Sequence, residues 1–243
     1  MVRWITIITL CTSAFMSSNI FAFGTSQSGA QYLESICGTA QKVGEHCHIG
    51  TEQLHPTQLT FGAIEVDSRS FKIATMSPTK LQKYIDAHIV PVVIGPDGSV
   101  YITDHHHFAM AMAKAFGATT EISAVVVQNW SEKSAEEFWR LMDKQSYTYL
   151  YDENGVGPKS PRDLPKQIFD LKNDSFRSLA WAVSNGGGYE TSAVPHADFL
   201  WANFFRLKIL KDAIDNDFEN TVLKAIPMAH SDDAKTLPGY LAE

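Results

Sequence analysis

The 243-residue sequence has few cysteines, no excess of positive charge and few long apolar runs. Its 27 Asp and Glu residues outnumber its 20 Lys and Arg residues, which gives a formal net charge of −7. An acidic chain lacks the basic field that holds duplex DNA regardless of sequence, which argues against tight non-specific duplex binding. The absence of a fixed-period repeat excludes a solenoid. The absence of a glycine-rich Walker loop leaves no sign of P-loop nucleotide chemistry.

One long apolar run is present, at the N-terminus. Arg3 precedes an apolar stretch over residues 4–16, and Ala22 is a small residue suited to a cleavage point. This order is typical of a secretory signal peptide, and the stretch is short for a transmembrane helix. An uncleaved N-terminal anchor is the alternative. We therefore expect residues 1–22 to be a signal peptide and the mature protein to be periplasmic or secreted, with no transmembrane segment.

Two cysteines remain after the signal peptide, Cys37 and Cys47. An even pair in an exported protein predicts a disulfide, and closing so short a loop contributes about 2–3 kcal/mol. His46 and His48 flank Cys47, so a metal site is the alternative. Adjacent residues converge poorly on one tetrahedral centre, and the disulfide is the favoured interpretation.

The rest of the chain, with 44% hydrophobic and 19% charged residues overall, is globular in composition and changes pattern midway. After a lead-in over residues 23–53, residues 54–130 contain a predicted hairpin at 91–103, a helix at 105–116 and a strand at 121–127. From residue 131 to residue 243 the pattern predicts helices. The predicted fold is α+β: a small mixed sheet with helices, followed by a helical C-terminal half.

The order strand, turn, strand, Asp-x-His-His, helix resembles the ParB/sulfiredoxin superfamily, and more narrowly its exported group of ParB-like nucleases. The resemblance spans roughly residues 54–207 and implies a ParB/sulfiredoxin-like domain at 54–130. It is carried by Pro56–Leu59, Gly62, Glu65–Val66, Val90–Gly95, Asp104–Ala109, Leu164–Pro165, Leu171, Asp174–Ala180, Gly187–Tyr189 and Phe199–Ala202. Relatives bind nucleotide phosphates at this corner through a glycine and an arginine. Here His105 and Phe108 stand at those two positions.

The run from Asp104 to His107 is the strongest candidate site. First-turn amides of a helix favour an anion and keep nearby imidazoles neutral, and a neutral imidazole can act as a base or bind a metal. Successive helical residues point about 100° apart, so the three rings cannot share one target. We expect His105 to pack in the core or contact a ligand. His106 and His107 are candidate general bases or ligands of a divalent metal ion. Asp104 orients a histidine, joins the metal shell or caps the helix.

Glu65 and Arg177 complete the candidate site. Glu65 is expected in the loop after the first extended segment, as a catalytic carboxylate or as a solvated charge. Arg177 can supply the anion-binding charge that Phe108 lacks. The favoured alternative pairs Arg177 with Asp174 or Asp198, tying helices together.

These features predict an exported nuclease or phosphoesterase that acts on a phosphate-containing substrate, nucleic acid included. A non-catalytic module that binds an anion or a partner is the second interpretation. A nucleotide-dependent phosphotransferase is the third, and the scarcity of ATP outside the cytoplasm disfavours it.

Overall fold

A computed structural model describes residues 35–242 of the chain. The predicted signal peptide and the first part of the lead-in lie outside the described residues. Within residues 35–242, no helix is long and apolar enough to cross a membrane.

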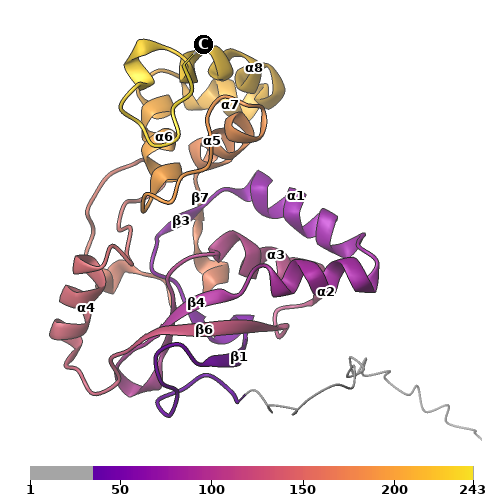
Figure 1. Ribbon diagram of the computed structural model, residues 1–243. Helices are drawn as coiled ribbons and strands as arrows, with labels where there is room; N and C mark the ends of the chain where they lie inside the picture. Colours follow the sequence, from indigo (N-terminus) through magenta and orange to yellow (C-terminus); the bar gives the residue numbers. More distant parts are fainter. Residues whose placement is uncertain (1–34, 243) are drawn as a thin grey trace, which may run out of the picture. The chain divides into compact units, whose positions relative to one another are not determined.

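A five-stranded mixed sheet with the order β1-β6-β4-β5-β2 organises the first part of the chain (Figure 1). Its strands are β1 (His46–Gly50), β2 (Leu54–His55), β4 (Val90–Ile94), β5 (Val100–Ile102) and β6 (Glu121–Asn129). β4 and β5 form the predicted antiparallel hairpin, and β6 runs parallel to β4. Along β4 the buried side chains alternate in direction, as strand geometry requires. Val92 joins the main core, whereas Val93 packs with Phe138 in a separate cluster.

Strand β1 adds a sheet edge that the sequence prediction placed in the lead-in. It pairs antiparallel with β6, so residues 46–50 belong to the sheet. The segment before it is held by a disulfide between Cys37 and Cys47, which confirms the predicted bridge. Because both sulfurs are used in the bridge, the alternative metal site at these cysteines does not form.

Helices cover both faces of this sheet. α1 (Ala63–Ala74) and α3 (His106–Phe116) contact each other, and α2 (Pro78–Asp86) precedes β4. α4 (Ala135–Lys144) carries Phe138, which packs against Val93 of β4. Ser134 caps α4, because its side chain accepts a hydrogen bond from the Glu137 amide at 3.2 Å.

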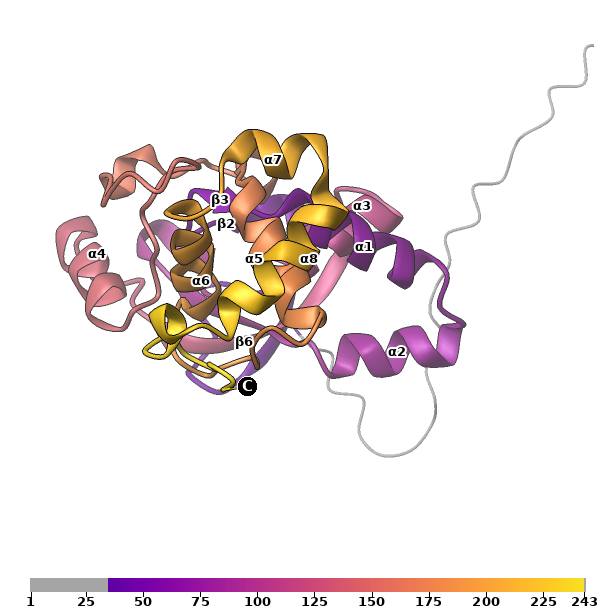
Figure 2. The same ribbon diagram turned by 90° about the horizontal axis from the view of Figure 1, so that it is seen from above.

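Four further helices form a second core in the C-terminal part. They are α5 (Ser175–Asn185), α6 (Ala197–Arg206), α7 (Lys211–Asn216) and α8 (Phe218–Ala229). α5 lies beside both α6 and α8 (Figure 2), and the fully buried Trp201 stacks on Tyr189 with ring centroids 4.0 Å apart. The helical structure is interrupted between Arg206, where α6 ends, and Lys211, where α7 begins.

The short parallel pair of β3 (Thr60–Phe61) and β7 (Lys172–Asn173) ties the two parts of the chain together. Gly62 follows β3 and lies so close to α5 that a Cβ there would come within 2.9 Å of the Ser178 amide nitrogen. The predicted boundary near Trp130 therefore marks a change of secondary structure within one compact unit.

Candidate functional site

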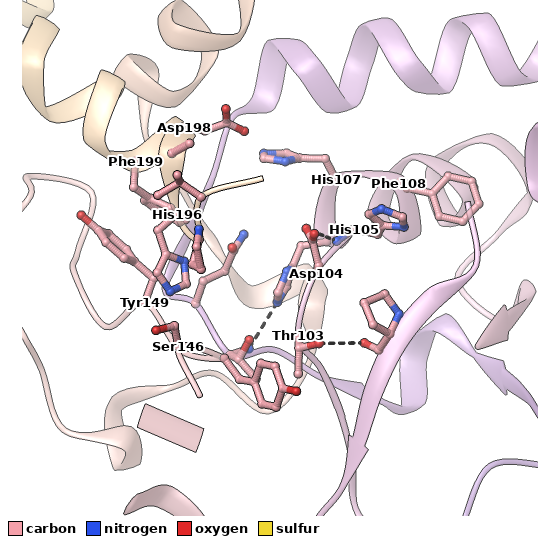
Figure 3. A pocket seen from close by; sticks show the side chains of 18 of the residues that line it. Thr103, Asp104, His105, His107, Phe108, Ser146, Tyr149, His196, Asp198 and Phe199 are labelled. Atoms are coloured by element: carbon pink, nitrogen blue, oxygen red, sulfur yellow. Dashed lines mark hydrogen bonds between the residues drawn. The ribbon is translucent and has the colours of Figure 1, made fainter. Parts of the chain in front are cut away.

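A cavity of about 550 Å³ opens where α3, α5 and α6 begin. One side carries Asp104 to Phe108 from the start of α3. Facing them are Tyr149, His196, Asp198 and Phe199 (Figure 3). Arg177 of α5 also lines the cavity. Segments far apart in sequence thus meet at one place.

The start of α3 differs from the sequence prediction by one residue. His105 is the N-cap, and its φ of 64° and ψ of 24° place it in the left-handed region. Glycine adopts this conformation at little cost, whereas a residue with a side chain does so rarely. The exposed Asp104 accepts a hydrogen bond from the His105 amide at 2.6 Å, and α3 has no side-chain cap. The predicted capping role of Asp104 is therefore wrong.

The buried His106 directs one ring nitrogen at the backbone. Its Nε2 accepts a hydrogen bond from the Thr57 amide at 3.3 Å. The neutral ring must then carry its proton on Nδ1, so His106 can act as a donor. Loss of hydration on burial, together with the charges of His107 and Arg177, lowers the pKa of His106 well below its ordinary value.

Both ring nitrogens of His107 have partners. Nε2 accepts a hydrogen bond from the Gly62 amide at 2.8 Å, and Nδ1 lies 3.4 Å from the Glu65 carboxylate. Burial and then the positive charge of Arg177 lower the pKa of His107 well below its ordinary value. With no nitrogen lone pair left, His107 does not suit the predicted role of general base. Through its contacts with Gly62 and Glu65, the His107 side chain links α3 to the start of α1.

Glu65 lies in the first turn of α1, and not in a loop as the sequence suggested. Only 4% of the residue is exposed, because the loop before α1 packs against α3 and α5. Its carboxylate accepts a hydrogen bond from Nε of Arg69 at 2.8 Å. Burial raises the pKa of Glu65, while the charges of Arg69 and Arg177 oppose that rise. The Glu65 carboxylate is therefore already paired with Arg69 and His107.

Arg177 is the least compensated charge of the cavity. It is 5% exposed, and its Nε and Nη1 atoms have no hydrogen-bond partner among residues 35–242. Its guanidinium stacks on the Phe199 ring, with Cζ 3.5 Å from the centroid. The favoured pairing is wrong: among the described residues Arg177 forms no ion pair with Asp174 or Asp198, and Asp174 instead binds Arg206 at 2.6 Å.

His196 and Tyr149 are cavity residues that the sequence prediction missed. His196 is the N-cap of α6 in the left-handed region, with φ of 61°, and α6 also lacks a side-chain cap. Its buried Nε2 has no partner in the described chain. Burial and then Arg177 lower the pKa of His196, whereas the backbone of Ser146 and Thr148 raises it. A positive φ is uncommon in residues other than glycine. The sequence therefore carries no signal that His196 adopts this backbone conformation at the cavity.

The predicted set of divalent-metal ligands, Asp104, His106 and His107, is not assembled. Within the described part of the chain, no group of three or more His, Cys, Asp or Glu side chains is arranged to hold a metal ion. The physical reason is that the Nε2 lone pairs of both histidines accept backbone N–H groups. These donors therefore do not fit a metal centre.

Comparisons with known proteins agree with this architecture. Residues 47–207 match the family described as "Putative ParB-like nuclease". No curated protein matches the chain. A solved structure, protein Atu1540 from Agrobacterium tumefaciens, is similar at 33% identity over 82% of this chain and 99% of that chain, with a TM-score of 0.74. The chain therefore belongs to the ParB-like nuclease family and shares its mixed α+β fold.

Proposed function

We propose that the protein hydrolyses a phosphate ester whose phosphate group binds in the cavity against Arg177. The observation that carries this proposal is the burial of a guanidinium with two nitrogens that have no hydrogen-bond partner in residues 35–242. Arginine stays protonated in proteins, and a buried charge is costly unless it is paired. A bound anion compensates that charge, and phosphate matches the guanidinium fork.

Two helix starts add donors for the same anion. α3 and α6 both begin at the cavity without a side-chain cap, so their first-turn amides are not satisfied by a capping side chain. Helix N-termini favour anions through these amides and through the helix dipole. His106 adds the proton on its Nδ1. Such donors stabilise the charge that develops on phosphate oxygens in the transition state.

His196 is the residue best suited to act as general base. The backbone of Ser146 and Thr148 favours a proton on the other ring nitrogen of His196, which leaves Nε2 with its lone pair. A water oxygen attacks phosphorus and its proton passes to Nε2, while the phosphorus–oxygen ester bond breaks. The leaving oxygen takes a proton from solvent, and His196 later returns its own proton to solvent.

The test is a turnover assay of the mature protein, residues 23–243, on a panel of generic phosphate esters. Turnover should fall by about 10- to 150-fold in Arg177→Met, as for the loss of a hydrogen bond to a charged group, and by about 10²–10⁴-fold in His196→Asn, as for the loss of a general base. Asparagine is chosen because it tolerates the left-handed backbone of position 196. His46→Asn, at an exposed position of β1, is the matched control and should retain full turnover. Phosphate binding without hydrolysis of any ester would contradict a hydrolase and favour the non-catalytic binding module.

We also propose that the protein acts outside the cytoplasm. The disulfide between Cys37 and Cys47 supports this, because such bridges persist in oxidising compartments. The sequence pattern of residues 1–22 supports it independently. N-terminal sequencing of protein from the native envelope or medium should begin near Phe23. Recovery of intact Met1 from a cytosolic fraction would contradict export.

A further inference from the structure

The cavity offers positive charge for one phosphate group. Among its lining residues the Lys and Arg side chains are Arg69 and Arg177. Arg69 is already committed, because its Nε donates to Glu65 at 2.8 Å. Arg177 is thus the cation at the cavity that makes no ion pair with a carboxylate among the described residues, although its charge acts on Glu65. A polynucleotide gains its affinity from several phosphates bound by several cations, and this cavity does not supply them.

Burial differs between the floor and the mouth of the cavity. His106 and Arg177 are 4% and 5% exposed, so the donors lie deep. Asp104 and Asp198 also line the cavity, but they are exposed and therefore mark its mouth. Two carboxylates at the mouth repel the flanking phosphates of a nucleic acid strand. They do not prevent a single phosphate group from reaching the guanidinium farther in.

The depth of Arg177 also limits the shape of the substrate. An internal phosphodiester continues as chain on both sides, so it needs a surface or a groove that is open at both ends. A terminal phosphate can enter first and leave the rest of its molecule behind it. The cavity volume of about 550 Å³ lies within the range of small-molecule sites. Tyr149, stacked on Phe199 at 3.8 Å between ring centroids, supplies a flat apolar wall.

We infer that the substrate is a small phosphomonoester, bound with its terminal phosphate against Arg177 and its organic part toward Tyr149. This inference rests on the proposed function, since it specifies which phosphate ester the same site accepts. The three non-bridging oxygens of a monoester can engage the Arg177 fork, the His106 Nδ1 proton and the helix amides together. A diester has only two such oxygens and carries a second substituent that must also be accommodated.

The experiment compares two chromogenic esters that share a leaving group, para-nitrophenyl phosphate and bis(para-nitrophenyl) phosphate. The expected result is a preference for the monoester of about 10- to 150-fold in kcat/KM, the range expected for one hydrogen bond to a charged group. The preference should disappear in Arg177→Met, with the exposed Arg140→Met as matched control. A second comparison uses a 5′-phosphorylated oligonucleotide and its unphosphorylated counterpart. Only the phosphorylated strand should compete with the monoester, and with a shallow salt dependence, as for one phosphate contact.

The outcomes separate the two proposals. Equal or preferred hydrolysis of the diester, still dependent on Arg177, would overturn the monoester inference and leave the phosphate-ester hydrolase in place. Competition by the unphosphorylated strand with a steep salt dependence would also overturn the inference, because it requires contacts to several internal phosphates. Absence of turnover and of binding for both esters would overturn both proposals.

Discussion

The guanidinium of Arg177 stacks on the ring of Phe199, with Cζ 3.5 Å from the ring centroid, and has no carboxylate partner among residues 35–242. Arg206 makes a similar contact with Phe176, at 4.5 Å, but also binds Asp174 at 2.6 Å. The two arginines thus share an aromatic neighbour and differ in their charge partner. This contrast separates an arginine that holds the fold together from one whose charge remains for a ligand.

Stability measurements should distinguish these two arginines. Arg177→Met should leave the free energy of unfolding unchanged or raise it in the absence of phosphate, because an uncompensated buried charge is removed. Arg206→Met should lower it by about 3 kcal/mol, since Asp174 is left buried without its partner. Urea denaturation in a phosphate-free buffer provides both values. A large loss of stability in Arg177→Met would show that Arg177 supports the fold and would argue against a ligand role.

His107 should behave as a structural residue. His107→Ala leaves the Gly62 amide without its acceptor and Glu65 without its neighbour, so the free energy of unfolding should fall by about 1–3 kcal/mol. Residual turnover should fall only in step with the folded fraction. The comparison is a denaturation curve beside a turnover assay at matched folded protein, with exposed His46→Ala as control. An unchanged denaturation midpoint with abolished turnover would instead identify His107 as a catalytic base.

Much of the local structure could be predicted from the sequence. The β4–β5 hairpin follows from a Gly-Pro-Asp-Gly turn, and the caps of α4 and α5 follow from Ser134 and Asp174. The disulfide follows from an isolated cysteine pair in a predicted exported chain. All of these depend on short-range chemistry or on composition.

The roles of the site residues could not be predicted, because they depend on contacts between distant segments. Nε2 of His107 accepts a hydrogen bond from the amide of Gly62, 45 residues away in the sequence. Arg177 is left without a partner because Arg206 occupies Asp174. His196 enters the cavity only because α6 packs beside α5. The run of three histidines lines the cavity, but the hydrogen bonds of each ring depend on segments that the run itself does not specify.

The lowered pKa values of His106 and His107 predict acid sensitivity. The pKa of a histidine in the unfolded chain is about 6.5. Above that pH both histidines are neutral in the folded and in the unfolded chain, so their protonation does not lower the free energy of unfolding. As the pH falls below that value, the unfolded chain binds protons that the folded chain does not, so stability is lost. The raised pKa of Glu65 acts in the opposite direction, since the folded state takes up a proton at Glu65 before the unfolded state does. The loss should therefore begin as the pH falls through about 6.5 and become steeper below it.

Urea denaturation at intervals from pH 8 to pH 5 measures this effect. Each histidine contributes at most about 1.4 kcal/mol per pH unit below its unfolded-state pKa. His107→Gln should reduce the slope because it removes one of the two groups. A free energy of unfolding that stays constant or rises between pH 7 and pH 5.5 would contradict neutral, buried histidines at the start of α3.

Calorimetric titration of the purified protein with inorganic phosphate tests the anion site most directly. We expect one phosphate per chain, and a dissociation constant at least about tenfold weaker in Arg177→Met, the loss expected for a hydrogen bond to a charged group. Arg140→Met, at an exposed position of α4, should bind phosphate like the unmodified protein. Phosphate binding that is absent from the unmodified protein, or equally tight in Arg177→Met, would contradict the account.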